Sequence, residues 1–296
     1  MSTADDLVAD SGQAEAVIYE VTATGVAVLT LNRPDRLNTW GGDIATAFYA
    51  GIERAEDDPD VRVIVLTGRG KAFCAGAQLG SMGNVAESID KTDEGKLASL
   101  VGDRQPHHLT TLGKPVIAAI NGSCVGIGLT QALMCDVRFA AAGAKFAASF
   151  ARRGLIAEYG VSWILPRLTG WGVALDLLLS GRTFLADEAA QLGLVKEVVP
   201  PDQLMTRAMA YAEDIAQNCS PASMAIIKRQ AYGDAMREVA DSSALSEALL
   251  QQSLKRPDVI EGITSFLEKR APSFPGLSAS AESFNTGKDD HEQLGL

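Results

Sequence analysis

The clearest pattern along the chain is a series of short, mainly apolar segments, each followed by glycine, asparagine or proline. Residues 25–31, 61–67 and 115–120 are of this kind, and their β-branched residues predict strands. Because apolar residues do not alternate regularly with polar ones, we expect sheets buried on both faces, with helices packed outside. Apolar residues at helical spacing predict a helix at 43–56, and a shorter one follows at 129–135.

The pattern changes near Pro201. Before it, two further strands are predicted at 137–141 and 145–148. After it the strands stop, and the spacing predicts three helices, at 202–217, 221–252 and 257–270.

These elements predict an α/β protein in four parts. They are a disordered tail at 1–15, an α/β core at 16–200, a helical oligomerisation region at 201–270 and a second disordered tail at 271–296. The tails are recognised by their polar composition, which offers little apolar surface to bury.

Composition and charge exclude several classes of partner. A net charge of −11 argues against nucleic acid and against an anionic membrane surface. The first residues lack the basic and apolar regions of a signal peptide, and no apolar run is long enough to cross a membrane, so we expect a cytoplasmic protein. The four cysteines match no metal motif, so we expect free thiols and no metal site.

Two segments of small residues are the first candidates for chemistry. Residues 71–79 (KAFCAGAQL) and 121–129 (NGSCVGIGL) each follow a predicted strand, and the second opens a predicted helix. Small residues let the backbone approach a ligand, and a helix start leaves N–H groups unpaired. Either turn alone is better explained as a tight connection. Facing each other, the two would direct two donors at one oxygen, as in an oxyanion hole.

Several segments, in their order and spacing, resemble the crotonase superfamily, also called the enoyl-CoA hydratase/isomerase family. They are 31–38 (LNRPDRLN), 70–77 (GKAFCAGA), 121–128 with the later Cys-Asp pair, and 261–270 (EGITSFLEKR). The resemblance runs from about residue 18 to residue 274. It implies the crotonase (ClpP-like) fold, a spiral of repeated β-β-α units with a helical C-terminal region, assembled as a homotrimer or a hexamer made of two trimers.

The resemblance also implies roles for individual residues. The backbone N–H groups of Ala77 and Ile127 would hold the thioester oxygen of an acyl-CoA, and Ile127 narrows the pocket where many members have glycine. The residues implied at the CoA site are Arg36, Ala75, Gln78, Leu79, Phe266 and Lys269, the last two in the same or a neighbouring subunit. Gln78 stands where members often have aspartate. Coenzyme A enters as part of the substrate, and no permanently bound cofactor is expected.

The acid/base group distinguishes reactions within this family. Hydratases commonly use two glutamates, and the matching positions here are Thr130 and Phe150, neither of which can act as a carboxylate. Residues 154–162 instead resemble the segment that carries the catalytic glutamate of peroxisomal-type Δ3,Δ2-enoyl-CoA isomerases, which places Glu158 in that role. Apolar neighbours should raise its pKa towards working pH. We therefore expect a 3-enoyl to 2-enoyl isomerase with Glu158 as proton shuttle. The plainer interpretation of Glu158 is a carboxylate that interacts with the dipole at the start of the following helix.

Other functions stay open at this stage. One is an enoyl-CoA hydratase in which Glu158 activates water alone. A second is an acyl-CoA-binding protein without turnover. A third is hydrolysis or C–C cleavage, which would need another acid/base, such as one from the pair His107 and His108, although these are expected to be solvated.

A few further residues are interpreted as structural. Trp40, Trp163 and Trp171 are expected in core or subunit contacts rather than against a ligand. Asp136 is expected to hydrogen-bond the backbone, with no catalytic role.

Overall fold

A six-stranded sheet forms the centre of the protein. The structure is a computed structural model that describes residues 15–78 and 105–277. The strand order is β1-β2-β3-β5-β7-β10, and all neighbours run parallel except the β1–β2 pair at one edge. The strands are β1 (Val17–Val21), β2 (Val26–Leu31), β3 (Val63–Gly68), β5 (Val116–Ile120), β7 (Val137–Ala141) and β10 (Glu197–Val199).

A second, four-stranded sheet has the order β4-β6-β8-β9. Its strands are β4 (Ala72–Cys74), β6 (Ser123–Val125), β8 (Lys145–Ala147) and β9 (Thr183–Leu185). The strands β4, β6 and β8 are parallel, and each follows a strand of the large sheet closely in sequence. This alternation of strands between two sheets agrees with the expected β-β-α repeat.

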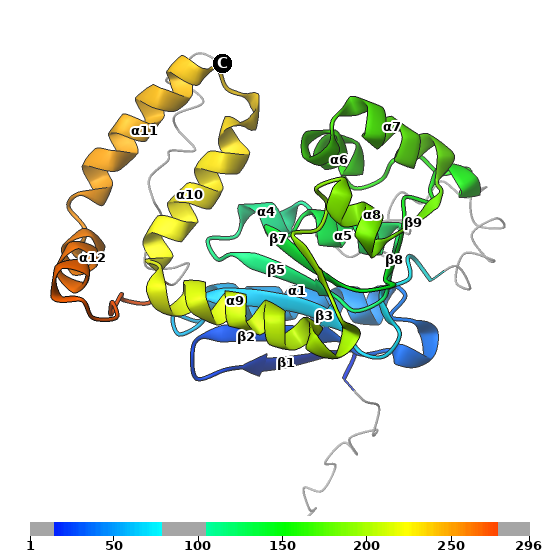
Figure 1. Cartoon of the computed structure of the whole chain (residues 1–296), viewed down its shortest axis with the longest axis horizontal. Helices are drawn as coiled ribbons and strands as arrows, with labels where there is room; N and C mark the ends of the chain where they lie inside the picture. The colour runs from blue at the N-terminus through cyan, green and yellow to red at the C-terminus, as the bar shows by residue number, and fades with distance from the viewer. Residues whose placement is uncertain (1–14, 79–104, 278–296) are drawn as a thin grey trace, which may run out of the picture.

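The central strands are buried on both faces, as their continuous apolar sequences predict. In β3, Ile64 and Leu66 join the larger core cluster, whereas Val63 and Val65 face a second cluster. The first cluster includes helix α1 (Gly42–Asp57), and the second is closed by α9 (Leu204–Asn218). Helices therefore cover both faces of the large sheet (Figure 1).

The remaining helices of the core are the short α4 (His108–Thr111), α5 (Ile127–Leu133), α6 (Val161–Thr169), α7 (Trp171–Ser180) and α8 (Ala186–Gln191). Of these, α4 lies beside α10 (Pro221–Gly233), and the others lie near the small sheet (Figure 1). Single 3-10 turns occur at Pro34–Arg36, Ala151–Arg153 and Pro201–Gln203.

The C-terminal helices α10 (Pro221–Gly233), α11 (Val239–Ser253) and α12 (Pro257–Glu268) extend to one side of the core (Figure 1). The single helix predicted over 221–252 is wrong, because a 3-10 turn at Asp234–Met236 divides it. Asp234 stabilises this break by accepting hydrogen bonds from Arg237 (2.8 Å) and from the hydroxyl of Ser242 (2.6 Å). No helix of the described residues is long and apolar enough to cross a membrane.

Both predicted tails fall largely outside the described residues. The C-terminal one, predicted from residue 271, begins against the core instead. Phe274 is buried, and its carbonyl accepts a hydrogen bond of 2.7 Å from Arg62.

Candidate active site

The first small-residue turn is held by the segment that precedes α1. Trp40 N donates to Gly76 O (2.8 Å), and Gln78 N donates to Trp40 O (2.9 Å). Asn38, fully buried, donates to the carbonyl of Ala72 (2.8 Å) at the start of the same segment. These bonds fix the course of the backbone from residue 72 to residue 78.

The two bonds to Trp40 also decide the direction of the Ala77 N–H. Ala77 lies opposite Trp40 in a parallel bridge, and its two neighbours make the hydrogen bonds. In such a ladder the intervening residue directs its own N–H to the other side. Among the described residues the Ala77 N–H has no acceptor, so it is available to a ligand.

The second donor comes from the first residue of α5. Gly126 precedes the helix at φ 55° and ψ −121°, a conformation that glycine adopts most readily. Ile127 then begins the helix, so its N–H has no acceptor within the helix, and none is found elsewhere in the described ranges. All seven residues of α5 are buried, which holds this N–H in a fixed place.

The two turns lie against each other. They follow β4 and β6, which are parallel neighbours in the small sheet. A Cβ added to Gly126 would lie 3.9 Å from the Cα of Gly76, and one added to Gly128 would lie only 2.3 Å from the carbonyl oxygen of Cys74. Glycine at position 128 is thus required for this approach, which brings the two free N–H groups to the same region.

Thr130 and Phe150, the residues that the family resemblance matches to the two hydratase glutamates, are both buried and carry no carboxylate. The hydroxyl of Thr130 donates to Gly126 O within the first turn of α5 (3.3 Å), and Phe150 is only 4% exposed in the larger core. Neither side chain can transfer a proton to carbon, so any acid or base must come from elsewhere.

Glu158 lies in the loop between the 3-10 turn at Ala151–Arg153 and α6. Burial raises the pKa of its carboxyl, as expected from its apolar neighbours. The side chain has no hydrogen-bond or ion-pair partner in the described part of the chain, and α6 has no side-chain N-cap bond. The simpler interpretation, a carboxylate bound to the start of a helix, is therefore not supported by the contacts.

Unusual backbone conformations occur beside the predicted site residues. Within the described ranges, four non-glycine residues have positive φ: Leu37, Asn38, Tyr159 and Lys269. Leu37 follows Arg36, Tyr159 follows Glu158, and Lys269 is itself a predicted CoA contact. Such conformations cost energy and concentrate at functional sites, which favours these loops as parts of a site.

Comparison with known proteins agrees with this geometry. The family model described as enoyl-CoA hydratase/isomerase matches residues 21–277. The chain belongs to the enoyl-CoA hydratase/isomerase family. It is therefore an enzyme of a family that acts on acyl-CoA, and its two-sheet architecture is the crotonase fold.

Individual members are similar over most of their length. The 1,2-epoxyphenylacetyl-CoA isomerase of Escherichia coli is 35% identical over 85% of this chain and 95% of its own. The crystal structure of an enoyl-CoA hydratase from Mycobacterium marinum is 69% identical, covers 75% of this chain and 100% of its own, and has a TM-score of 0.64. A probable enoyl-CoA hydratase/isomerase from Mycobacterium abscessus is 35% identical, with coverages of 88% and 99% and a TM-score of 0.79.

In this family member, the predicted CoA contact Arg36 is already paired. Its guanidinium donates to Asp43 at 2.7 Å and to the side-chain oxygen of Gln78 at 3.2 Å. The pKa of Asp43 is lowered overall. Partial burial alone would raise it, but hydrogen bonds from the Ile44 N–H and from Arg36 outweigh that effect. A CoA phosphate approaching Arg36 would thus compete with Asp43, and Gln78 positions this arginine.

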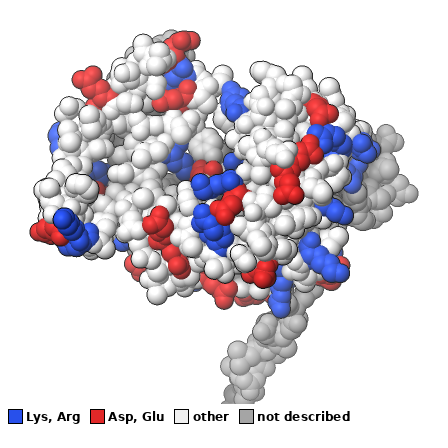
Figure 2. Space-filling view, viewed as in Figure 1, with Lys and Arg blue, Asp and Glu red and all other residues white. Residues whose placement is uncertain are grey.

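The other predicted CoA residues are not all brought together. Ala75 lies in the first turn, where its N–H donates to Leu37 O (3.1 Å), whereas Leu79 lies outside the described residues. Phe266 is 81% exposed on α12, and Lys269 ends that helix, far from the two turns in Figure 1. Phe266 and Lys269 therefore do not complete the site within one chain. Basic and acidic side chains are interspersed on the face shown in Figure 2.

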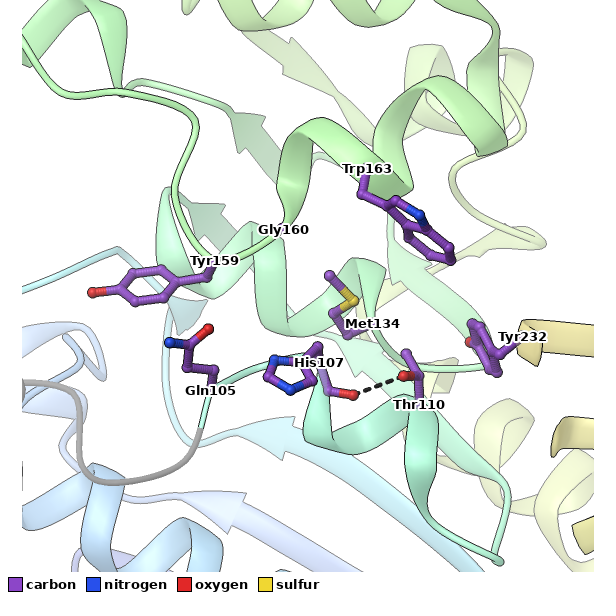
Figure 3. A pocket seen from close by; sticks show the side chains of 8 residues that line it. All are labelled: Gln105, His107, Thr110, Met134, Tyr159, Gly160, Trp163 and Tyr232. Carbon is purple, nitrogen blue, oxygen red and sulfur yellow. Dashed lines mark hydrogen bonds between the residues drawn. The ribbon is translucent and has the colours of Figure 1, made fainter. Parts of the chain in front are cut away.

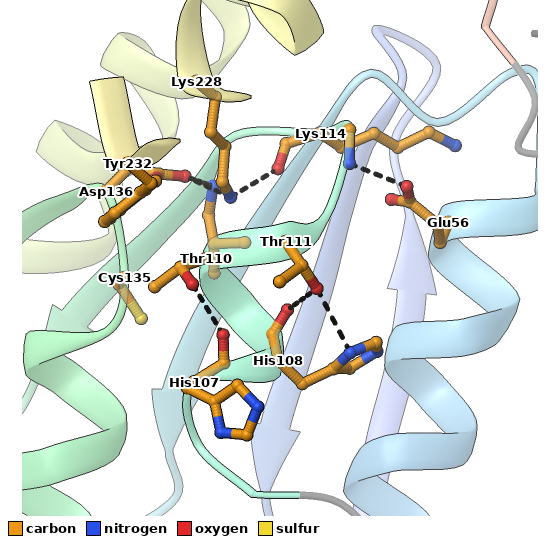
Figure 4. Close-up of polar contacts among 12 residues, drawn as sticks. Glu56, His107, His108, Thr110, Thr111, Lys114, Cys135, Asp136, Lys228 and Tyr232 are labelled. Atoms are coloured by element: carbon orange, nitrogen blue, oxygen red, sulfur yellow. Dashed lines mark hydrogen bonds and ion pairs between the residues drawn. The ribbon is translucent and has the colours of Figure 1, made fainter. Parts of the chain in front are cut away.

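A partly buried polar network joins α10 to the core (Figure 4), and of this network only the backbone bond of Asp136 is expected from the sequence. Asp136 accepts a hydrogen bond from Val116 N (2.7 Å), which confirms its predicted bond to the backbone. It also binds the ammonium group of Lys228 (2.7 Å) and the hydroxyl of Tyr232 (3.1 Å) on α10. Burial raises the pKa of Tyr232, and so does the charge of Asp136. The hydroxyl therefore stays protonated, and α10 is fixed to the core.

A pocket of about 320 Å³ lies between α4, α6 and α10 (Figure 3). Its walls include Met134 at the end of α5 and Tyr232 on α10. His107, expected to be solvated, is exposed but lines this pocket. Trp163, expected in core or subunit contacts, also lines it.

No group of three or more potential metal-binding side chains occurs among the described residues. The four cysteines are free, and three of them are buried.

Proposed function

We propose that this protein is an enoyl-CoA isomerase that shifts a 3-enoyl double bond to the 2-enoyl position. The observation that carries the proposal is the combination of two backbone donors on adjacent turns with Glu158, a partly buried carboxylate, all three without a partner among the described residues. The N–H groups of Ala77 and Ile127 would bind the thioester oxygen, and Glu158 would be the acid/base. The name of the Escherichia coli relative, an isomerase of a CoA thioester, is compatible with this chemistry.

One carboxylate is sufficient for the reaction. Glu158 would remove a proton from C2 of the 3-enoyl thioester, and the negative charge would spread onto the thioester oxygen. The two N–H groups stabilise this dienolate, each donor being worth about 2.7–4 kcal/mol in comparable sites. The protonated Glu158 would then return the proton to C4, leaving the double bond between C2 and C3. The raised pKa of Glu158 favours both halves of this transfer.

Hydration of a 2-enoyl thioester is the alternative reaction. Several relatives carry the name hydratase, but Thr130 and Phe150 replace the two carboxylates that hydratases commonly use. A hydratase here would rely on Glu158 alone to activate water. A binding protein without turnover is the alternative from another class, and it would bind acyl-CoA equally well without Glu158.

The discriminating experiment compares two substrates. Purified protein is incubated with 3-hexenoyl-CoA and, separately, with crotonyl-CoA, and the absorbance of the conjugated enoyl group is followed. We expect it to rise with the first substrate and to change little with the second. Rapid loss of the crotonyl-CoA signal without isomerisation would favour hydration, and no change in either would favour the binding protein.

The role of Glu158 is tested by Glu158→Gln. Loss of the base should lower kcat by about 10²–10⁴-fold. The fold should survive, because the partly buried carboxylate has no partner that the amide would lose. Glu20→Gln, on the exposed side of β1, is a matched control that should keep full activity. An active Glu158→Gln protein would contradict the assignment.

We also propose assembly into trimers or pairs of trimers. On α12, Ile260, Ile263, Phe266 and Leu267 are each more than half exposed, which is unusual for a helix that faces solvent. Contact with a second subunit would bury them, and would also bring Phe266 and Lys269 to a neighbouring site. Light scattering of the purified protein would show the mass of a single chain if this proposal is wrong.

A further inference from the structure

The pocket between α4, α6 and α10 has an aromatic lining. Four of its side chains are aromatic rings, those of His107, Tyr159, Trp163 and Tyr232, and the thioether of Met134 lies among them. Figure 3 shows Tyr159 near one end of the pocket, Trp163 and Tyr232 near the other, and His107 and Met134 between. Its volume of about 320 Å³ is within the range of small-molecule sites.

This pocket begins beside the proposed acid/base. Tyr159 is the next residue after Glu158, and the charge of Glu158 contributes to the raised pKa of Tyr159, after burial. Met134 ends the helix that Ile127 begins. At a rise of 1.5 Å per residue, Met134 in the pocket wall therefore lies about 10 Å along the helix axis from Ile127.

That separation matches the reach of a medium-length acyl group. Carbon–carbon bonds of about 1.5 Å advance an extended chain by roughly 1.25 Å per carbon, so about eight carbons cover the distance. A six-carbon chain that ends in a phenyl ring reaches about as far as ten carbons, which takes it past Met134, whereas a plain hexanoyl group falls short of Met134.

We infer that this pocket binds the end of the acyl chain and selects acyl groups that terminate in an aromatic ring. The inference rests on the proposed function, since it takes the thioester to be held by Ala77 and Ile127. It adds the class of substrate and the residues that choose it.

The physical basis is the geometry of ring contacts. Aromatic rings attract one another in edge-to-face and offset arrangements, and a thioether sulfur also contacts ring edges favourably. The Tyr232 ring is held in place because its hydroxyl is bound to Asp136. A phenyl group also has fewer rotamers to lose on binding than a flexible alkyl chain of the same reach.

Binding of saturated thioesters tests the inference without any need for turnover. Isothermal titration calorimetry would compare hexanoyl-CoA, decanoyl-CoA and 6-phenylhexanoyl-CoA. We expect the phenyl compound to bind about tenfold more tightly than hexanoyl-CoA and several-fold more tightly than decanoyl-CoA. Equal or weaker binding of the phenyl compound relative to decanoyl-CoA would overturn the inference.

Two variants locate the preference. Trp163→Leu should reduce affinity for the phenyl compound to that for decanoyl-CoA, with hexanoyl-CoA unchanged within twofold. His107→Ala changes an exposed side chain and so leaves folding unaffected; it should weaken phenyl binding alone by about threefold. Trp171→Leu, at a tryptophan 72% exposed on α7, is the matched control and should bind all three like the parent. The inference would be wrong if the preference for the phenyl compound survives in both pocket variants, or if both variants lose the same affinity for all three thioesters. The selectivity would then come from residues outside this pocket.

Failure of this inference and failure of the proposed function give different results. If the phenyl preference is found but 3-hexenoyl-CoA is not isomerised, the pocket stands and the reaction is wrong. If isomerisation is found without any ring preference, the reaction stands and the pocket assignment is wrong.

Discussion

Gly128 offers a direct test of the proposed oxyanion hole, because it controls how closely α5 approaches β4. A Cβ at this position would lie 2.3 Å from the carbonyl oxygen of Cys74 and 2.7 Å from its Cβ. Contacts under 3.0 Å are essentially never made by real Cβ atoms. In Gly128→Ala, the first turn of α5 must therefore move from β4 by at least 0.7 Å, the difference between 3.0 and 2.3 Å.

The effect on the reaction follows from that displacement. Donors of an oxyanion hole work at about 2.7–3.1 Å from the oxygen, so a shift of this size takes the Ile127 N–H out of range. Loss of one donor corresponds to about 2.7–4 kcal/mol, or a fall in kcat of roughly 10²–10³-fold. KM should change much less, because the donors act mainly on the charge that develops in the transition state.

The assay is steady-state isomerisation of 3-hexenoyl-CoA, together with exchange of the C2 hydrogens in D₂O, which reports enolate formation. Gly172→Ala is the matched control. This glycine lies in α7, has ordinary φ, and an added Cβ would meet nothing within 4 Å. The control should keep full activity and gain slight stability, since alanine favours the helix.

A Gly128→Ala protein that folds and retains kcat within threefold would refute the reasoning. It would mean either that the two turns do not form the hole or that the backbone absorbs the clash without moving Ile127. Should the variant fail to fold, Gly76→Ala is a milder substitute. There the added Cβ would lie 3.3 Å from Val125 O and the residue would be strained at φ 105°.

Three further results are expected. Lys228→Met should lower the free energy of unfolding by about 3–5 kcal/mol in urea denaturation, because it leaves Asp136 without its buried partner; the exposed Lys255→Met should have almost no effect. In a pH–rate profile, kcat/KM should fall on the acid side with a midpoint above pH 4.5. Glu158 must be ionised to take the proton, and burial raises its pKa above 4.5. A midpoint below pH 4.5 would contradict this assignment. A thiol reagent at pH 8 should modify only Cys219 in the native protein and all four cysteines in denaturant. The other three cysteines are buried, and burial raises the pKa of Cys74 to about 11. Rapid reaction of more than one cysteine in the native protein would be inconsistent with this packing.

The long elements of the fold could be predicted from local patterns. β3 and β5 are continuous runs of buried apolar residues, and α1 has one apolar face, so each leaves a periodic signal. The three-residue strands β4 and β6 leave none, although they place the two turns side by side. Their pairing depends on contacts between segments about fifty residues apart, which no local pattern records.

Lys228 shows the same limit at a single residue. Its position on α10 is compatible with a solvated lysine on an amphipathic helix, yet its side chain is only 6% exposed. It is buried because Asp136, at the start of the distant strand β7, supplies a compensating charge, and Lys114 O accepts a second hydrogen bond (3.1 Å). Only the tertiary structure reveals that partner.

The residues proposed for the reaction and those proposed for the acyl pocket also differ in how far they can be predicted from the sequence. Each proposed oxyanion turn is encoded within nine consecutive residues, and the proposed acid/base Glu158 within one loop, so both could be predicted from the sequence. The aromatic pocket instead takes its residues from four separate stretches between His107 and Tyr232. Substitutions there can change the acyl group that binds without touching either donor or the carboxylate. If both proposals hold, the reaction is tested at the two turns and Glu158, whereas the acyl group is tested at Trp163 and its neighbours.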